Sequence, residues 1–124
     1  MALTVANECK KAALDGITAL LNGGNFVLQA TGPTTLASLT LNATAFGAAT
    51  TASPSVAASN SITADTTVTA GTITLFRLET SGAAVRINGT VGTSGADINV
   101  SDNVIPSGAT QVSSSGISLT LQLT

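Results

Sequence analysis

The chain has 124 residues, a length that favours one domain with its own hydrophobic core. Only 8% of the residues are charged, and the net charge at pH 7 is −2. Four Lys and Arg residues and three Phe, with no Tyr or Trp, exclude a nucleic-acid-binding surface, because such a surface needs clustered cations or stacking aromatic rings. No segment reaches the roughly 20 apolar residues of a membrane span, so we expect no membrane partner.

The first predicted element is a helix over Thr4–Leu21. Its apolar residues recur at intervals of three and four and share one stripe: Val5, Cys9, Ala13, Ile17 and Leu20. Thr4 is the expected N-cap, and Gly23 and Gly24 can end the helix in a left-handed conformation. Gly16 costs about 1 kcal/mol relative to Ala, so we expect the stripe to be held by packing.

Two strands are predicted next, over Asn25–Ala30 and Ser38–Phe46. In the second, apolar and polar residues alternate with period two, which is typical of a sheet with one solvent-exposed face. Between them, Thr31-Gly32-Pro33 has the composition of a turn. From Gly47 to Asn60 large apolar residues become scarce, which predicts a long surface loop. The alternative is an extended arm that orders only against a neighbouring molecule.

The remainder of the chain, from Ser61 onward, is predicted to be nearly all strand. The candidate strands are rich in β-branched or alternating residues: Thr66–Thr69, Thr72–Glu79, Val85–Val91, Ala96–Val100 and Ile117–Thr124. Turns are expected at Ser81-Gly82 and at Pro106-Ser107-Gly108. Short strands separated by turns predict a mainly β fold. We expect residues 1–124 to form a single domain, with a helix in 1–24 and an antiparallel, jelly-roll-like β-sandwich over 25–124.

Residues able to do chemistry are scarce. The absence of His removes the commonest general base and metal ligand, and the lone cysteine lacks a base partner. Asp97, Asn99 and Ser101 alternate as in an EF-hand loop, but Asp102 and Gly108 stand where that loop needs Gly and Glu. We therefore predict no enzyme, no catalytic residue, no cofactor and no metal. A looser oxygen-ligand site at Asp97 and Asp102 stays open as an alternative.

The segment GTVGTSGADINVSD (Gly89–Asp102) places glycines at 89, 92 and 95. A phosphate-binding loop needs a lysine after its glycines and a helix after that, and neither follows here. The glycines are better interpreted as turn or bulge residues that join Val85–Val91 to Ala96–Val100.

The run FRLETSGAAVRINGTVGTSGADINV, with the opening MALTVAN, resembles a recurrent family of small tailed-phage virion structural proteins. The similarity is carried by Phe76-Arg77, Ser81-Gly82 and Gly89–Asp97. Leu75 and Ala83 stand where the family often has Tyr and Gly, and the region from Ala30 to Asn60 does not align. The resemblance implies a component of the phage particle.

Small, charge-poor β-sandwich proteins of this length are similar to capsid cement or decoration proteins. A low charge content is typical of a protein docked in an assembly, because a free monomer usually stays soluble through its charges. We expect a capsid-surface protein of the virion, present in the host cytoplasm during assembly, that binds the major capsid protein shell from outside. It is expected to form a homodimer, or as second choice a homotrimer.

The surfaces expected to contact the shell are Gly47–Asn60 and the strand faces rich in Thr and Asn. The alternative function is a tail- or fibre-associated adhesion module that binds a glycan of the host surface. The absence of Tyr and Trp counts against it, because sugar rings are usually held on aromatic faces.

Overall fold

The structure is a computed structural model that describes residues 4–122. One helix is followed by nine strands: α1 (Asn7–Ala19), β1 (Asn25–Ala30), β2 (Thr34–Thr40), β3 (Ser55–Ala58), β4 (Gly71–Thr72), β5 (Leu75–Glu79), β6 (Val85–Gly92), β7 (Ile98–Asn99), β8 (Val104–Ile105) and β9 (Ser118–Leu121). The predicted fold class is confirmed, since the protein is mainly β with one N-terminal helix and is compatible with a β-sandwich.

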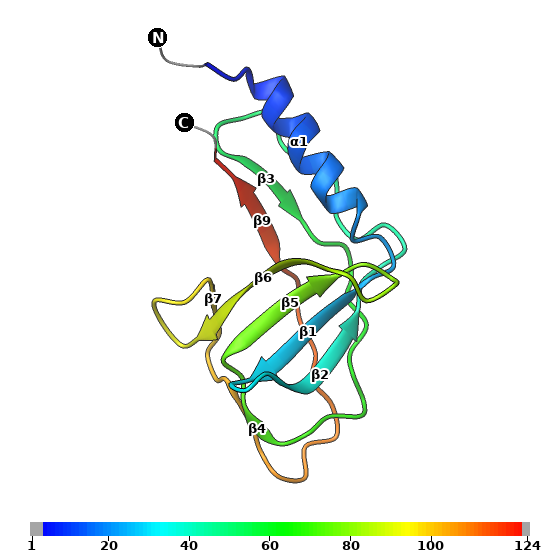
Figure 1. Cartoon of the computed structure of the whole chain (residues 1–124), viewed down its shortest axis with the longest axis vertical. Helices are drawn as coiled ribbons and strands as arrows, with labels where there is room; N and C mark the ends of the chain where they lie inside the picture. The colour runs from blue at the N-terminus through cyan, green and yellow to red at the C-terminus, as the bar shows by residue number, and fades with distance from the viewer. Residues whose placement is uncertain (1–3, 123–124) are drawn as a thin grey trace.

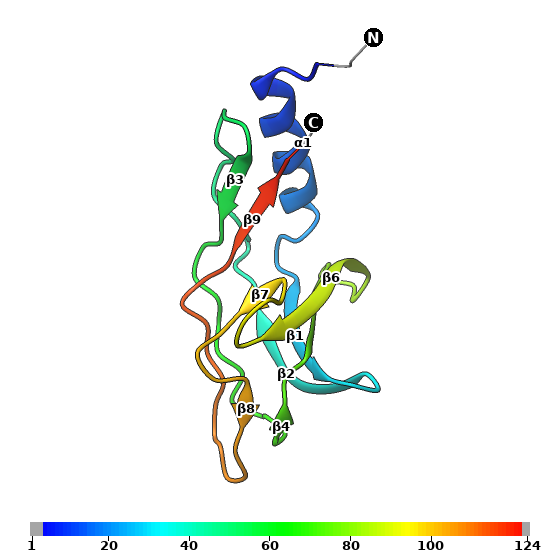
Figure 2. The same ribbon diagram turned by 90° about the vertical axis from the view of Figure 1, so that its left-hand side faces the viewer.

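The main sheet has the strand order β2-β1-β5-β6-β7 (Figure 1). Its first four strands pair antiparallel, whereas β6 and β7 run parallel, so the sheet is mixed and not purely antiparallel as expected. The pairs β3–β9 and β4–β8 form separate two-stranded sheets. Figures 1 and 2 show an elongated molecule, with α1, β3 and β9 at one end, the main sheet in the middle, and β4 and β8 at the other end.

The strands agree with the sequence pattern to different degrees. Asn25–Ala30 has the predicted bounds, and Val85–Val91 matches β6 to within one residue. The strand expected over Ser38–Phe46 is β2, which begins and ends earlier. The strand expected over Thr66–Thr69 is wrong, because no strand forms there. Of the last predicted strand, Ser118–Leu121 forms β9, and residues 123–124 lie outside the described part of the chain.

The helix is present, but the prediction of its buried face is wrong. Ala6 is its N-cap and makes no side-chain capping bond, so Thr4 does not cap it. The stripe lies outward: Cys9 and Ala13 are exposed, Val5 and Ile17 are half-buried, and Leu20 is 54% exposed. The side chains buried instead are Lys10, Leu14 and Thr18 of α1, with Leu21 just after it.

Two polar residues explain why hydrophobicity alone misplaces this face. The Lys10 ammonium donates to Ser53 Oγ at 2.9 Å, and Thr18 Oγ1 donates to the Asp15 carbonyl at 3.2 Å. Because these polar groups find hydrogen-bond partners, they can be buried beside Leu14 when α1 packs on β3 and β9.

The segment Gly47–Asn60 differs from the expected long loop or arm, because it contains β3 and packs against its own chain. Its main chain is closed by hydrogen bonds from Thr50 N–H to the Val56 carbonyl and from Gly47 N–H to the Ala58 carbonyl, each 2.9 Å long. Ser55 and Ala57 are fully buried. The small side chains of this segment let α1 lie close to β3. A search of the sequence for large apolar residues could not identify this segment as buried.

One cluster of buried apolar residues connects the elongated molecule. It contains Phe26, Leu39, Phe76 and Leu78 of the main sheet, together with Leu14, Leu21 and Ala57 from the helical end. Phe26 and Phe76 meet edge to face, with ring centroids 6.2 Å apart. Phe26 of this pair also lines a concavity of the surface.

Candidate functional site

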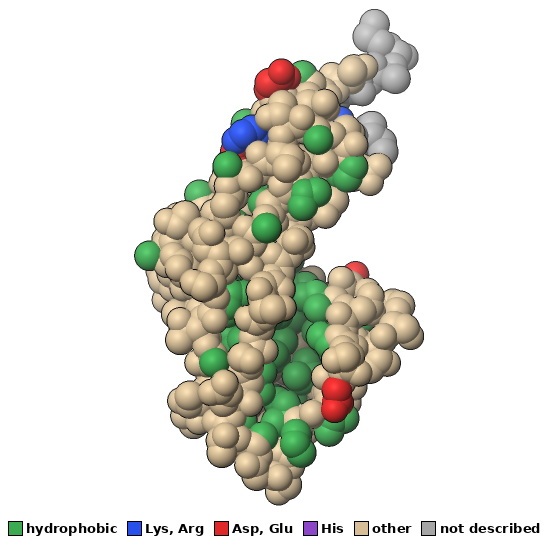
Figure 3. All heavy atoms as spheres, turned by 180° about the vertical axis from the view of Figure 1, so that it is seen from behind, with side chains coloured by type: hydrophobic (Ala, Val, Ile, Leu, Met, Phe, Trp, Pro, Cys, Tyr) green, Lys and Arg blue, Asp and Glu red, His purple; other side chains and the backbone are tan. Residues whose placement is uncertain are grey.

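A groove lies across one face of the main sheet and is the candidate functional site (Figure 3). Its volume is about 450 Å³. Phe26, Leu28, Ile73 and Val91 line its floor, and Figure 3 shows hydrophobic side chains at the bottom of the hollow. This is the size range of clefts that bind small ligands or partner side chains.

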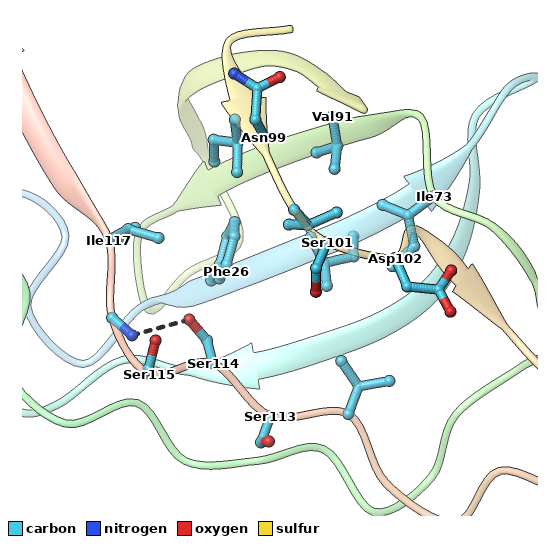
Figure 4. Close-up of a pocket in the computed structure, with 15 residues that line it drawn as sticks. Phe26, Ile73, Val91, Asn99, Ser101, Asp102, Ser113, Ser114, Ser115 and Ile117 are labelled. Atoms are coloured by element: carbon cyan, nitrogen blue, oxygen red, sulfur yellow. Dashed lines mark hydrogen bonds between the residues drawn. The ribbon is translucent and has the colours of Figure 1, made fainter. Parts of the chain in front are cut away.

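Two extended segments form the walls of the groove. One is Ile98–Asp102, which includes β7, and the other is Val112–Ile117 (Figure 4). The second wall is tied down at both ends: Val112 exchanges main-chain hydrogen bonds of 2.9 Å with Asp65, and Ile117 N–H donates to Ser59 Oγ at 2.9 Å. The wall therefore crosses the sheet without joining it, which leaves a hollow above floor residues that are themselves only 4–7% exposed.

The chemistry of the groove is that of a binding surface. Its rim carries hydroxyl groups from Ser101 and Ser113–Ser115, an amide from Asn99 and the carboxylate of Asp102 (Figure 4). Among the residues that line it there is no Lys or Arg to hold an anion and no nucleophile beside a general base. The arrangement can accept apolar side chains on the floor and hydrogen-bonding groups at the rim.

The two carboxylates singled out in the sequence make separate local contacts. Asp97 Oδ2 accepts from Thr90 N–H at 2.9 Å and lies 3.1 Å from Thr90 Oγ1. Asp102 Oδ1 accepts from Val104 N–H at 3.0 Å and closes a short turn. Within residues 4–122, no group of three or more His, Cys, Asp or Glu side chains could hold a metal ion. The geometry joins Asp97 to Thr90 and Asp102 to Val104, so each carboxylate makes its own local contact.

The glycine-rich segment is a closed loop at the edge of the sheet. Gly89 lies opposite Phe76 in the β5–β6 register, and a Cβ there would lie 2.6 Å from Asp97 Oδ2 and 2.8 Å from Phe76 Cε1. Gly95 has a φ of +69°, a conformation that favours glycine. Turn geometry therefore explains Gly95, whereas Gly89 is needed inside a strand because an aromatic ring and a carboxylate approach it closely.

The charged groups of α1 attach it to the segment that precedes β3. Asp15 pairs with Lys11 and accepts from Ala49 N–H at 2.8 Å. The hydrogen bond from Lys11, and after it the one from Ala49, lower the pKa of Asp15 below its ordinary value of 3.8. On the main sheet, Arg77 lies 3.8 Å from Glu79. Asp65, Asp97 and Asp102 also accept main-chain hydrogen bonds, so eight of the ten charged side chains take part in contacts within the fold.

Sequence patterns could not reveal the groove, because its lining comes from five separate parts of the chain. Nothing in the part of the chain that the structure describes is both helical and apolar over a length that spans a bilayer. No protein-family model matches the chain, and no curated protein or solved structure shows significant similarity to it.

Proposed function

We propose that this protein is a virion structural protein of a tailed phage, which binds the outside of the major capsid protein shell and stabilises it. The observation that carries the proposal is an open apolar groove on a protein with very few charges. Such a surface is suited to permanent docking, since burying it desolvates few ionic groups. The resemblance of Gly89–Asp97 to phage virion proteins supports the same conclusion.

The proposed mechanism is mass action. A protein that binds only the assembled shell lowers the free energy of that shell by RT ln(1 + [L]/Kd) at each site, about 2.7 kcal/mol when its concentration is 100 times Kd. Repeated over the shell, this resists the outward pressure of packaged DNA. Because few charges are available, we expect binding to depend only weakly on salt.

The groove is the proposed contact with the shell, in place of the segment Gly47–Asn60. That segment is largely occupied by its own chain, since Ala49, Ser55 and Ala57 are buried and α1 packs on β3. The groove, by contrast, is a hollow of about 450 Å³ above its apolar floor, with room for an apolar segment of the capsid protein (Figure 3).

Particles assembled without the protein test the proposal. We expect them to form but to release DNA at a lower temperature than complete particles, and added wild-type protein should restore them. Ser101→Arg places a bulky charge at the rim of the groove and should abolish the rescue. Ser107→Arg, a matched change at an exposed turn residue that does not line the groove, should rescue as well as the wild type.

Two outcomes would contradict the proposal. If particles without the protein resist heat normally but fail to adsorb to host cells, the protein is a tail or fibre adhesion module. If Ser101→Arg and Ser107→Arg rescue equally, the groove is not the contact. Copy number on a stained gel of purified virions separates the two functions further, since hundreds of copies per particle support the shell and a few tens or fewer support the tail.

A further inference from the structure

β9 is an edge strand, and its outer side faces solvent. Among residues 4–122 it pairs only with β3, and in Figure 1 no other strand lies on its far side. An edge strand presents unpaired N–H and C=O groups, which can pair with another chain unless the edge is protected. The hydrogen bonds of β3 reveal which groups of β9 are free.

The main-chain groups of Ser118 and Thr120 point away from β3. Val56, which lies opposite Thr120, uses its carbonyl and its N–H to bind Thr50 on the other side of β3. Ala58, opposite Ser118, accepts from Gly47 on that same side. Directly opposed residues in an antiparallel pair point both toward or both away from each other. Ser118 and Thr120 therefore present N–H and C=O groups on the open edge, with no partner among residues 4–122.

The edges of the main sheet carry protecting contacts that the four-residue strand β9 lacks. Along β2, Ser38 N–H binds the Asp65 carboxylate, and Thr40 exchanges hydrogen bonds with Thr63. Along β6, a bulge near Arg86 and the contact between Asp97 and Thr90 interrupt the edge. Charges and bulges are the usual means of blocking edge pairing. Residues 117–122 have no charge, no proline and no register shift.

We propose that the β9 edge binds the same edge of a second copy, antiparallel across a two-fold axis. In the register that uses the free groups, Ser118 exchanges main-chain hydrogen bonds with Thr120 of the second copy, and symmetry repeats the pair. Leu119 then lies opposite Leu119 of the second copy, and Ile117 lies opposite Leu121. A two-fold interface must be self-complementary. This strand meets that requirement, because it has no charge and its apolar and polar side chains alternate.

The product is a continuous four-stranded sheet with both helices on one face. Ile117, Leu119 and Leu121 pack against the core but stay half-exposed, so the second copy would cover apolar surface that the monomer leaves open. α1 packs mainly on β3. The two β3 strands would be three strand spacings apart, about 14 Å, which accommodates two helices whose axes need about 8–10 Å.

Sedimentation equilibrium of the full chain tests the interface, from about 1 μM to about 1 mM, a range that detects weak dimers. We expect the wild type to reach the mass of a dimer. Thr120→Pro removes an outward N–H without touching the β3 ladder, so it should raise Kd at least tenfold while the thermal melt stays cooperative. Thr120→Val keeps the N–H and should dimerise normally.

A charge exchange tests the register independently. Ser118→Lys with Thr120→Lys places like charges opposite each other and should give monomers, whereas Ser118→Lys with Thr120→Glu places opposite charges together and should restore the dimer. A wild type that stays monomeric or reaches the mass of a trimer would overturn the proposal, as would equal association of both double variants. The inference goes beyond capsid binding, because it concerns the free protein and can fail or succeed whatever the particle experiment shows.

Discussion

The closest packing in the glycine-rich loop gives a sharp prediction for Gly89→Ala. The added Cβ would lie 2.6 Å from Asp97 Oδ2 and 2.8 Å from Phe76 Cε1, both well inside an ordinary contact. Phe76 cannot yield freely, because it is buried and meets Phe26 edge to face. Asp97 can yield only by moving away from Thr90, whose N–H and hydroxyl it contacts.

The expected cost follows from these two neighbours. Overpacking that shifts side chains or backbone costs about 1–3 kcal/mol, and weakening the exposed contact between Thr90 and Asp97 adds about 1 kcal/mol. We expect Gly89→Ala to lower the free energy of unfolding by about 2–4 kcal/mol. For a domain of this size that is a fall in Tm of roughly 10 °C.

Thermal and urea denaturation, followed by circular dichroism, measure the effect. Gly95→Ala is the matched control: a Cβ there meets nothing within 4 Å, so only its φ of +69° opposes the change, at about 1–2 kcal/mol. Combining Gly89→Ala with Asp97→Ala removes one of the two close contacts, so the two losses should be less than additive. The reasoning is refuted if Gly89→Ala costs no more than Gly95→Ala, or if the double variant is strictly additive.

Three further predictions concern the helix and the carboxylates. Asp15 has a lowered pKa in the folded protein, so its stabilisation is present above pH 3.8 and is lost as the pH falls through the folded pKa. Asp15→Asn should therefore reduce the stability seen in urea melts at pH 7 and match the wild type in strong acid, and a constant difference across pH would contradict this. Leu14→Ala should lower the free energy of unfolding by about 2–5 kcal/mol, because Leu14 is buried. Cys9→Ala should change it by no more than about 0.5 kcal/mol, because Cys9 is exposed. A larger loss for Cys9→Ala than for Leu14→Ala would mean that the face predicted from the sequence is the buried one. Melts with EDTA and with added calcium should coincide, and a shift of several degrees would show that Asp97 or Asp102 binds the ion.

Local patterns were sufficient for the fold class and for several element positions. The turns at Thr31-Gly32-Pro33, Ser81-Gly82 and Pro106-Ser107-Gly108 form where glycine and proline predict them. Asn25–Ala30 is a strand with the predicted bounds, and a helix lies near the N-terminus. These features depend on backbone preferences and on short-range periodicity, both of which are properties of neighbouring residues.

Two features of the helical end depended on contacts between distant residues. The buried face of α1 includes Lys10, which is accommodated because Ser53, far along the chain, accepts its hydrogen bond. The segment Gly47–Asn60 becomes ordered because β9, from the other end of the chain, pairs with β3.

The same holds for the glycine-rich loop and for the groove. The sequence alone excluded a phosphate loop in Gly89–Asp97, because no lysine follows the glycines. Its prediction of turn or bulge glycines holds for Gly95, whereas Gly89 and Gly92 lie in β6. Only the tertiary structure decided that Gly89 must leave room for Phe76, and that a hollow with an apolar floor remains between two crossing segments. A pattern of neighbours specifies which residues are apolar, but burial depends on which distant segments come to lie over them.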